Sequence, residues 1–167
     1  GLIKAQKKLA TVYENDTAHQ IDIGYVGEVT EINTSIIADL LNQGYVPVIA
    51  PIGMGEHGES YNINADYVAA EIAGALHAEK LLLLTDVEGV YKNFADKSSF
   101  LSQLRMDEAR EYIRSGIIEG GMIPKVEACL RALEAGAHKA HIIDGRLAHS
   151  IILEIFTSRG IGTMVLR

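Results

Sequence analysis

A helical pattern followed closely by four consecutive leucines limits how this chain can fold more than any other feature. Apolar residues recur at helical spacing from residue 68 to residue 76, which predicts a helix. Residues 81–84 then form a short, wholly apolar run, as in a strand covered on both faces. Strands and helices alternate along the rest of the chain. This alternation predicts an α/β fold with an open, mainly parallel sheet sandwiched between helices.

Apolar periodicity predicts the other elements in the same way. Alternating residues indicate strands near the amino end, and prolines in the strand after the first helix suit a sheet edge. The expected strands are 9–14, 19–32, 46–52, 140–143 and 163–166, and the expected helices are 34–42, 106–115, a segment from Pro124 to Glu134, and 149–157.

Composition excludes several classes of protein. The 167 residues suffice for one ordinary domain with a real core. The net charge is −7 with both signs interspersed, which argues against nucleic acid as a partner but not against a nucleotide. Cys129 is the only cysteine, so we expect no internal disulfide and a cytoplasmic location. No apolar run reaches the length of a membrane span and the first residues do not resemble a signal peptide, so no membrane is expected.

A glycine-rich segment at residues 53–58 matches the pattern G-x-G-x-x-G of dinucleotide-binding proteins. That fingerprint must open directly into a helix, because the helix N-terminus holds the pyrophosphate. Here six residues, ESYNIN, separate the glycines from the next helical pattern. We therefore expect a turn between two strands, with a dehydrogenase as a minor alternative.

Lys125 is the residue most indicative of chemistry. It lies in the first turn of a predicted helix, where the helix dipole disfavours a cation, and Gly120 and Gly121 stand just before it. Free N–H groups, close backbone approach and an ammonium group together suit an anion such as phosphate. The alternative is an exposed lysine after an ordinary glycine turn.

Two further polar groups lie at element ends. Asn62, Asn64 and Asp66 gather where a helix begins, which suits either ligand binding or plain capping. Residues 85–91, TDVEGVY, follow the leucine strand at its carboxyl end, where open α/β sheets bind ligands. The alternative there is an ordinary strand-to-loop turn. The six histidines have no convincing metal-ligand spacing, and no metal site is expected.

The order of these motifs is more specific than any one of them. NINAD, LLLLTDVEGVY, GGMIPK, AHIIDGR, ILEIF and GIGTM follow one another along the chain. In this the sequence resembles acetylglutamate kinases of the amino-acid kinase family over nearly its whole length. The resemblance implies two lobes, with residues 1–78 ending the N-acetyl-L-glutamate lobe, including a hairpin lid, and residues 79–167 forming the ATP lobe. It implies transfer of the ATP γ-phosphoryl group to the side-chain carboxylate of N-acetyl-L-glutamate, in arginine biosynthesis.

The resemblance also implies roles for individual residues. Lys125 and Asp66 would be catalytic, the lysine binding phosphate and the aspartate orienting lysines by hydrogen bonds. Mg²⁺ would bind through the nucleotide phosphates. The substrate would contact Asn62, Asn64, Gly24 and Gly27. ATP would contact Thr85, Asp86, Val87, Glu88, Gly89, Val90, Tyr91, Ile117, Ile118, Glu119, Gly121 and Lys125.

Some members of this family are inhibited by L-arginine. In them the inhibitor contacts a histidine before IIDG, a glutamate of the following helix and a glycine after that helix. His141, Glu154 and Gly160 match these three positions. The resemblance therefore implies an allosteric arginine site, the alternative being a structural histidine and a surface glutamate.

The sequence departs from the family pattern at its amino end. The glycine-rich phosphate loops, a second catalytic lysine and a substrate-binding arginine have no counterpart in residues 1–60. We therefore expect a fold that is incomplete at the amino end, no kinase activity in this chain alone, and self-association into a homo-oligomer. Glu119 is a smaller departure, because an uncharged residue is usual there. Other amino-acid kinases, for aspartate or for glutamate 5-phosphorylation, and a non-catalytic nucleotide- or arginine-binding module remain alternatives.

Overall fold

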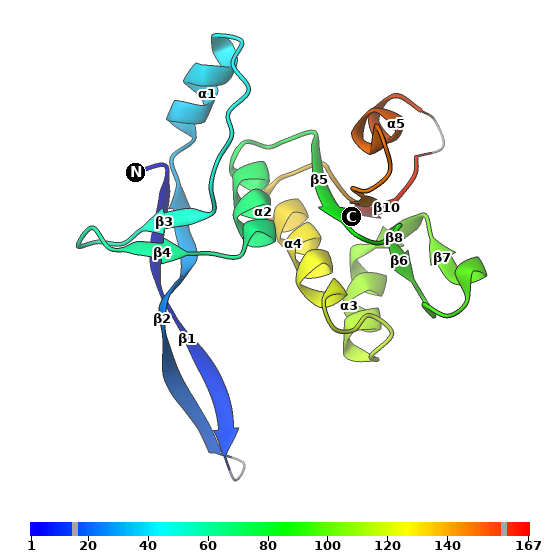
Figure 1. Ribbon diagram of the computed structural model, residues 1–167, viewed down its shortest axis with the longest axis horizontal. Coiled ribbons are helices and arrows are strands. Elements are labelled where there is room, and N and C mark those ends of the chain that lie inside the picture. The colour runs from blue at the N-terminus through cyan, green and yellow to red at the C-terminus, as the bar shows by residue number, and fades with distance from the viewer. Residues whose placement is uncertain (15–16, 158–159) are drawn as a thin grey trace. The chain divides into compact units, whose positions relative to one another are not determined.

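The computed structural model describes residues 1–14, 17–157 and 160–167, and these form two compact units. Unit 1 comprises Gly1–Val68 and unit 2 comprises Ala69–Arg167 (Figure 1). The division falls inside helix α2 (Ala65–Ala75), whereas the sequence placed it after that helix, at residue 78. The assignment of a substrate lobe and an ATP lobe stays a prediction.

Unit 1 is built on a long antiparallel hairpin. Strands β1 (Ile3–Glu14) and β2 (Thr17–Ile32) form the hairpin, and β3 (Ile52–Met54) and β4 (Ser60–Asn62) complete a ring in the order β1-β2-β4-β3. Single residue pairs join the two hairpins, Lys4 with Met54 and Val26 with Asn62. Helix α1 (Thr34–Asn42) follows β2, and Asn33 caps it by accepting a hydrogen bond from the Ser35 N–H.

The glycine-rich segment is a turn between antiparallel strands β3 and β4. The Gly58 N–H donates to the Gly55 carbonyl at 3.2 Å, and Gly58 has a φ of +87°, which favours glycine. The prediction of a turn is confirmed. The dinucleotide alternative is wrong, because strand β4 rather than a helix follows the glycines.

The strand expected at residues 46–52 is wrong for most of its length. Only Ile52 belongs to a strand, β3, and the preceding residues run from α1 to β3 outside any sheet (Figure 1). Val46 is 87% exposed and Val48 is 97% exposed. A strand forms only where a neighbouring strand accepts its hydrogen bonds, and within the described residues this segment has no such neighbour.

Unit 2 contains an open four-stranded sheet in the order β5-β9-β10-β8. Two of its three strand pairs, β5 with β9 and β10 with β8, are parallel, whereas β9 and β10 are antiparallel. The predicted α/β fold with a mainly parallel sheet is confirmed in this unit. The strands are β5 (Lys80–Thr85), β8 (Gln103–Arg105), β9 (Lys139–Asp144) and β10 (Thr163–Leu166), and a small sheet pairs β6 (Val90–Tyr91) with β7 (Phe100–Leu101).

Helices cover this sheet and create the core. Helix α4 (Met122–Ala135) packs on β5, β9 and β10, and α5 (Ser150–Phe156) packs on β9 (Figure 1). Helix α3 (Met106–Arg114) packs beside β8, and a short 3₁₀ turn, η1 (Lys97–Ser99), precedes β7. The predicted buried stripe of α4 is confirmed at Val126, Cys129, Leu130 and Leu133. Gly136, with a φ of +123°, ends the helix as expected.

The leucine strand is covered less completely than its sequence suggested. Leu81 and Leu83 are buried, but Leu84 is 46% exposed. Successive side chains of a strand point to opposite faces, so Leu84 lies on the face opposite Leu81 and Leu83, and that face is covered less completely. The expectation that both faces are covered is therefore wrong at Leu84. No helix in the described part of the chain is both long enough and apolar enough to cross a membrane.

Candidate functional site

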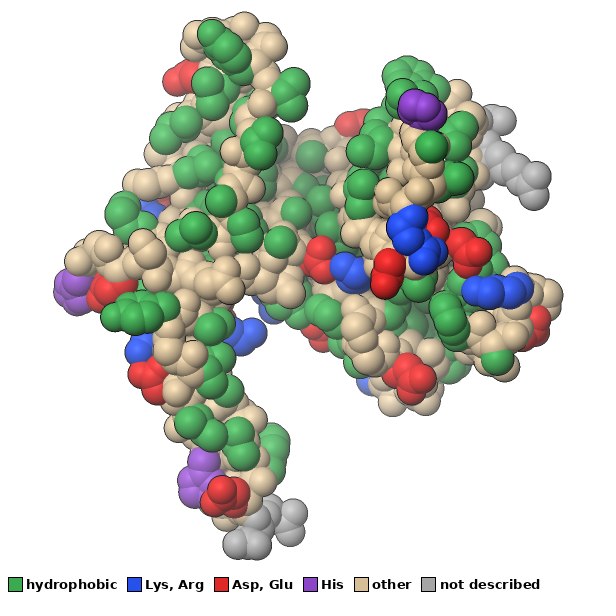
Figure 2. Space-filling model, in the orientation of Figure 1, with side chains coloured by type: hydrophobic (Ala, Val, Ile, Leu, Met, Phe, Trp, Pro, Cys, Tyr) green, Lys and Arg blue, Asp and Glu red, His purple; other side chains and the backbone are tan. Residues whose placement is uncertain are grey.

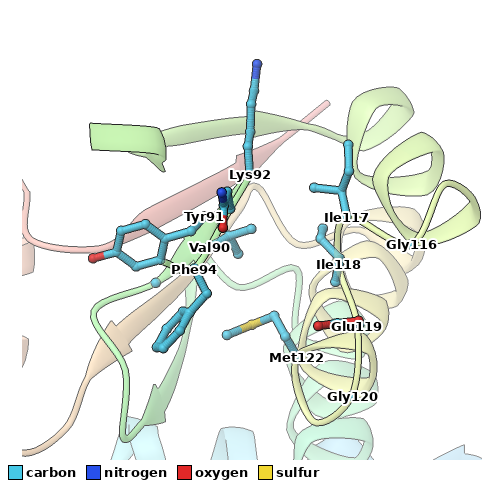
Figure 3. A pocket seen from close by; sticks show the side chains of 12 residues that line it. Val90, Tyr91, Lys92, Phe94, Gly116, Ile117, Ile118, Glu119, Gly120 and Met122 are labelled. Carbon is cyan, nitrogen blue, oxygen red and sulfur yellow. The ribbon is translucent and has the colours of Figure 1, made fainter. Parts of the chain in front are cut away.

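A cavity in unit 2 has a volume of about 710 Å³ and lies between two segments of the chain (Figure 3). One wall runs from Gly89 to Phe94 and the other from Gly116 to Met122. Met122 extends from one wall toward the ring of Phe94 on the other (Figure 3). A cavity of this size, with apolar and polar groups in its lining, suits a small molecule.

A buried threonine fixes the first wall. Thr163, on β10, accepts a hydrogen bond from the Val90 N–H at 2.8 Å and donates one to the Leu101 carbonyl at 2.6 Å. Its hydroxyl thereby holds β6 and β7 to the main sheet. Gly89 passes so close that a Cβ there would lie 2.5 Å from Thr163 Oγ1. The backbone of the wall is therefore held by packing that excludes a side chain at position 89.

An ionic and aromatic cluster supports the same wall. The Tyr91 hydroxyl donates to the Glu88 carboxylate at 2.5 Å, and Lys97 forms an ion pair with that carboxylate at 3.3 Å. Lys97 Nζ lies 4.5 Å from the centre of the Tyr91 ring and 4.4 Å from that of Phe94. The bond to Glu88 raises the pKa of Tyr91 to about 12. The Tyr91 hydroxyl bond in turn lowers the pKa of Glu88 below its usual range.

The second wall connects α3 to α4 through three glycines. Gly116 and Gly120 have φ values of +74° and +56°, which favour glycine, so the chain can turn sharply at both ends of the wall. Ile118 is only 2% exposed, and its N–H donates to the Tyr112 carbonyl at 2.9 Å. Ile117 remains 37% exposed and lines the cavity. This wall therefore combines a buried anchor with a neighbouring apolar side chain available to a ligand.

Lys125 lies in the first turn of α4, as the sequence predicted, and it is half-buried. However, fewer backbone N–H groups are free before Lys125 than the sequence predicted. The Met122 N–H donates to the Glu119 carbonyl and the Ile123 N–H donates to the Gly120 carbonyl, both at 3.2 Å. The expectation of free donors at these two positions is wrong, because the chain enters the helix through a tight turn. The role of Lys125 itself stays a prediction.

The cavity brings together half of the residues that the sequence assigned to ATP. Those that line it are Gly89, Val90, Tyr91, Ile117, Ile118 and Glu119, whereas Thr85, Asp86, Val87, Glu88, Gly121 and Lys125 are not among its lining residues. Sequence reasoning missed Lys92, Asn93, Phe94, Gly116 and Met122, and it named Gly120 only as part of the anion site before Lys125. Phe94, an aromatic residue inside a polar segment, was the one signal that could have indicated this wall.

The predicted substrate residues belong to unit 1, and several have structural roles there. Asn64 caps α2, since its side-chain oxygen accepts from the N–H groups of Asp66 and Tyr67 at 2.9 and 3.2 Å. A Cβ on Gly27 would lie 2.6 Å from the Cβ of Tyr61, so that glycine permits close packing. Asn62, at the end of β4, is exposed, and Gly24 has a φ of +87° in β2. Their contacts with a substrate stay predictions.

A second cavity, of about 210 Å³, contains all three residues predicted to bind arginine. His141 Nδ1 lies 2.7 Å from Glu154 Oε1, and both side chains are buried. The other oxygen of Glu154 accepts from the Ile161 N–H at 2.7 Å. Gly160, with a φ of +64°, passes so close that a Cβ would lie 3.2 Å from that oxygen. Lys80 and Lys139 also line this cavity.

Burial and a neighbouring carboxylate together set the protonation of His141. Burial lowers the pKa of His141, against an opposing effect of Glu154. The ring is therefore neutral near pH 7, and because Nδ1 faces a carboxylate, Nδ1 carries the proton and Nε2 is an acceptor. Nε2 is buried and makes no hydrogen bond within the part of the chain that the structure describes. Such a buried acceptor is costly unless a donor reaches it.

Residues 3–144 match the model of the "Amino acid kinase family". The match covers most of the chain. The chain belongs to this family. The two-walled cavity therefore lies in a protein whose relatives are kinases.

The chain is similar to several acetylglutamate kinases. It is 54% identical to that of Moorella thermoacetica over 164 residues, which are 98% of this chain and 55% of that protein. It is 54% identical to that of Heliobacterium modesticaldum over 168 residues, which are 100% of this chain and 57% of that protein. The chain spans about half the length of the curated relatives it matches.

Solved structures agree on the fold. An N-acetylglutamate synthase from Neisseria gonorrhoeae, complexed with coenzyme A and L-arginine, has a TM-score of 0.83 and 25% identity, and the match covers 99% of this chain and 36% of that one. A carbamate kinase from Giardia lamblia bound to AMP-PNP has a TM-score of 0.64 and 18% identity, covering 95% of this chain and 52% of that one. The second likeness shows a shared fold alone.

Proposed function

We propose that this chain forms the nucleotide-binding portion of an acetylglutamate kinase. The complete enzyme would transfer the γ-phosphoryl group of ATP to the side-chain carboxylate of N-acetyl-L-glutamate, in arginine biosynthesis and in the cytoplasm. The observation that carries this proposal is 54% identity to an acetylglutamate kinase over 98% of the chain. Identity at this level over nearly every residue is more specific than the family match alone. It favours this acceptor over those of aspartate kinase and glutamate 5-kinase.

The cavity fits a nucleoside. Its volume of about 710 Å³ is within the range of small-molecule sites, and Ile117, Phe94 and Met122 offer apolar surface for a base. Asn93 and Glu119 line it as well and offer polar groups for a ribose. Mg²⁺ usually keeps several waters and binds through phosphates in such enzymes, so it would need few ligands from this chain.

The proposed chemistry needs positioning and charge rather than a covalent intermediate. Phosphoryl transfer passes through a loose transition state whose negative charge is spread over the phosphoryl oxygens. In this proposal Lys125 contacts the phosphates as a point charge, and Asp66 orients the active-site lysines. Asp66 belongs to unit 1 and Lys125 to unit 2, so this pairing is a prediction about the assembled enzyme.

Calorimetry with Mg·ATP tests the nucleotide site in the 167-residue chain. Ile117→Trp would fill the cavity and weaken ATP binding by about tenfold or more. Ile151→Trp is a matched control, since Ile151 is similarly exposed, at 44% against 37%, but does not line the cavity. Equal affinity in both variants would contradict the proposed site.

A chimaera tests the acceptor. In it, this chain replaces the matched 164 residues of the Moorella thermoacetica enzyme. We expect the chimaera to phosphorylate N-acetyl-L-glutamate and to leave aspartate and glutamate unmodified, whereas the 167-residue chain alone forms no acetylglutamyl phosphate. A chimaera that folds and binds ATP but phosphorylates aspartate or glutamate instead would assign the chain to a different amino-acid kinase.

The cavity at His141 supports L-arginine as a regulatory ligand. A guanidinium group presents five N–H donors, which suits the Glu154 carboxylate and the acceptor Nε2 of His141. Lys80 and Lys139, which line the same cavity, would suit the α-carboxylate of an amino acid. The Neisseria gonorrhoeae synthase, which shares the fold, was solved with L-arginine. The proposal also includes a homo-oligomer as the regulated form.

Calorimetry with L-arginine and L-citrulline tests this second site. Citrulline keeps the shape of arginine but replaces the charged guanidinium with a neutral urea, so we expect arginine alone to bind. Glu154→Gln should weaken arginine binding, whereas Glu111→Gln, at an exposed glutamate of α3, should not. Equal binding of both ligands would contradict a charge-selective site.

A further inference from the structure

The side chain of Lys97 lies over two aromatic rings beside the cavity of about 710 Å³. Its Nζ is 4.5 Å from the centre of the Tyr91 ring and 4.4 Å from that of Phe94. An ammonium group this close to a ring is attracted to the negative potential of the ring face. Phe94 lines the cavity, whereas Lys97 is not among the lining residues. Lys97 is therefore placed to act on a bound molecule through these rings.

A carboxylate holds the ammonium group in this position. Lys97 Nζ forms an ion pair with Glu88 at 3.3 Å, and the Tyr91 hydroxyl donates to the same carboxylate oxygen at 2.5 Å. Tyr91 is buried, and its ring centre lies 5.2 Å from that of Phe100. Figure 2 shows acidic and basic side chains next to one another on this face of unit 2, so an ion pair alone does not distinguish Lys97. Its position over two rings does.

The ring of Phe94 is exposed enough to depend on these contacts. Phe94 is 62% exposed, and a side chain with so much free surface has more than one rotamer open to it. Its ring meets the ring of Tyr91 edge to face, with 5.6 Å between the centres and 83° between the planes. The ammonium group of Lys97 is a second contact. Together the two contacts favour the rotamer in which the ring lines the cavity.

The backbone of the loop that carries Phe94 and Lys97 is held by its own hydrogen bonds. The Lys92 N–H donates to the Ser99 carbonyl at 3.1 Å, and the Asn93 N–H donates to the Ser99 hydroxyl at 3.0 Å. The Ser99 hydroxyl donates in turn to the Asn93 carbonyl at 2.8 Å. These three bonds do not involve the Lys97 side chain. A change of that side chain should therefore leave the loop in place and release the ring.

We propose that Lys97 is a positioning residue of the nucleotide site, because it holds the ring of Phe94 where a bound base would stack on it. The inference rests on the proposed function for the identity of the ligand, a nucleoside. The role depends on charge, so arginine can replace Lys97 and methionine cannot. It also differs from the role proposed for Lys125, since Lys97 should affect adenosine and ATP alike.

Calorimetry with adenosine and with Mg·ATP tests this role in the 167-residue chain. Lys97→Met should weaken the binding of both ligands by about two- to fivefold, as for an exposed cation–π contact, and Lys97→Arg should restore it. Lys4→Met is the matched control, since Lys4 pairs with Glu31 and is similarly exposed, at 54% against 60%. Chemical denaturation verifies that the variants fold. A loss for ATP alone, or an equal loss in the control, would overturn the proposal.

A second substitution separates positioning from a general structural role. In a chain that carries Phe94→Leu, Lys97→Met should cause no further loss of affinity for adenosine, because no ring remains to be held. The same loss with and without the ring would overturn the proposal, since Lys97 would then act by another route.

NMR of phenylalanine labelled with ¹³C in the ring tests the contact without any ligand. Phe94→Leu assigns the signal of Phe94. We expect a lower order parameter for this ring in Lys97→Met than in the unaltered chain or in Lys97→Arg. An unchanged order parameter in Lys97→Met would overturn the inference. If the ring is released as expected but the unaltered chain binds no adenosine, the contact stands and the proposed function is contradicted.

Discussion

His141 and Glu154 form a buried pair in which the imidazole Nδ1 lies 2.7 Å from a carboxylate oxygen. The two residues come from strand β9 and helix α5 and lie on the wall of the smaller cavity. The pair has a structural role besides any role in ligand binding, because Glu154 also accepts from the Ile161 N–H. Its charge state should therefore affect both stability and the ligand site.

The stability of the chain should depend on pH through His141. Burial lowers the pKa of His141, so the folded chain binds this proton less tightly than the unfolded chain does. The stabilising contribution is thus fully present above the ordinary value of about 6.5 and is lost as the pH falls through the lowered pKa of the folded state. Urea unfolding between pH 5 and 8 measures it, and His141→Asn should flatten the profile. An unchanged slope in that variant would contradict the assignment.

Glu154→Ala should destabilise the fold. The change leaves His141 Nδ1 and the Ile161 N–H without their acceptor, and a buried donor without a partner costs about 1–3 kcal/mol each. The control is Glu111→Ala, since the ion pair of Glu111 with Arg114 is exposed and such pairs contribute about 0–1 kcal/mol. Chemical denaturation measures both losses, and equal losses would show that burial of the Glu154 carboxylate is unimportant.

Thr163→Val should loosen the first wall of the larger cavity. Valine keeps the shape of threonine but leaves the Val90 N–H and the Leu101 carbonyl without a partner, at a cost of about 1–3 kcal/mol. We expect a lower free energy of unfolding and weaker ATP binding together. Thr157→Val is the control, because the Thr157 hydroxyl donates to the Leu153 carbonyl at an exposed helix end. If the control lost as much stability and affinity, the wall would not depend on Thr163.

Tyr91 should titrate later than an ordinary tyrosine. Its hydrogen bond to Glu88 raises its pKa to about 12, so its phenol should stay protonated at pH 10.5, where an unperturbed tyrosine is largely ionised. NMR of tyrosine labelled with ¹³C at Cζ follows each ring, and Tyr91→Phe assigns the signal. Glu88→Gln removes the charge and should move the titration toward the ordinary value of about 10. Ionisation of Tyr91 together with the other tyrosines would contradict this bond.

Much of the fold was readable from local sequence. The bounds of α1 and β10 agree with the predicted ranges 34–42 and 163–166, because caps, glycines and apolar periodicity are properties of neighbouring residues. The prediction of a strand at 46–52 was wrong because a strand does not depend on neighbouring residues alone. Its apolar alternation is real, but a strand also needs a partner that is distant in the sequence.

The candidate sites were predictable where a motif was continuous. His141, Glu154 and Gly160 were each inferred from the family resemblance, and the structure gathers them in one cavity. The larger cavity was predicted only in part. Phe94 lines it from a loop and Met122 from the start of α4, and the position of each depends on how the neighbouring loop folds. Loops have no hydrophobic periodicity, so their conformation cannot be predicted from the sequence in this way. The N–H groups of Met122 and Ile123, before Lys125, are not free either. They donate to carbonyls within a turn, and the sequence does not predict these hydrogen bonds.

Lys125→Met should weaken the binding of ATP far more than that of adenosine. If the ammonium group contacts phosphate, its removal costs a charged hydrogen bond of about 1.5–3 kcal/mol, or roughly ten- to a hundredfold in affinity for ATP. Adenosine has no phosphate and should bind both proteins alike. Lys92→Met is the control, since Lys92 lines the cavity but its side chain points away from it (Figure 3). Calorimetry of the unaltered chain and both variants, each with ATP and with adenosine, decides between the two roles. An equal loss for ATP and adenosine in Lys125→Met would mean that Lys125 supports the fold of the pocket rather than binding the phosphates.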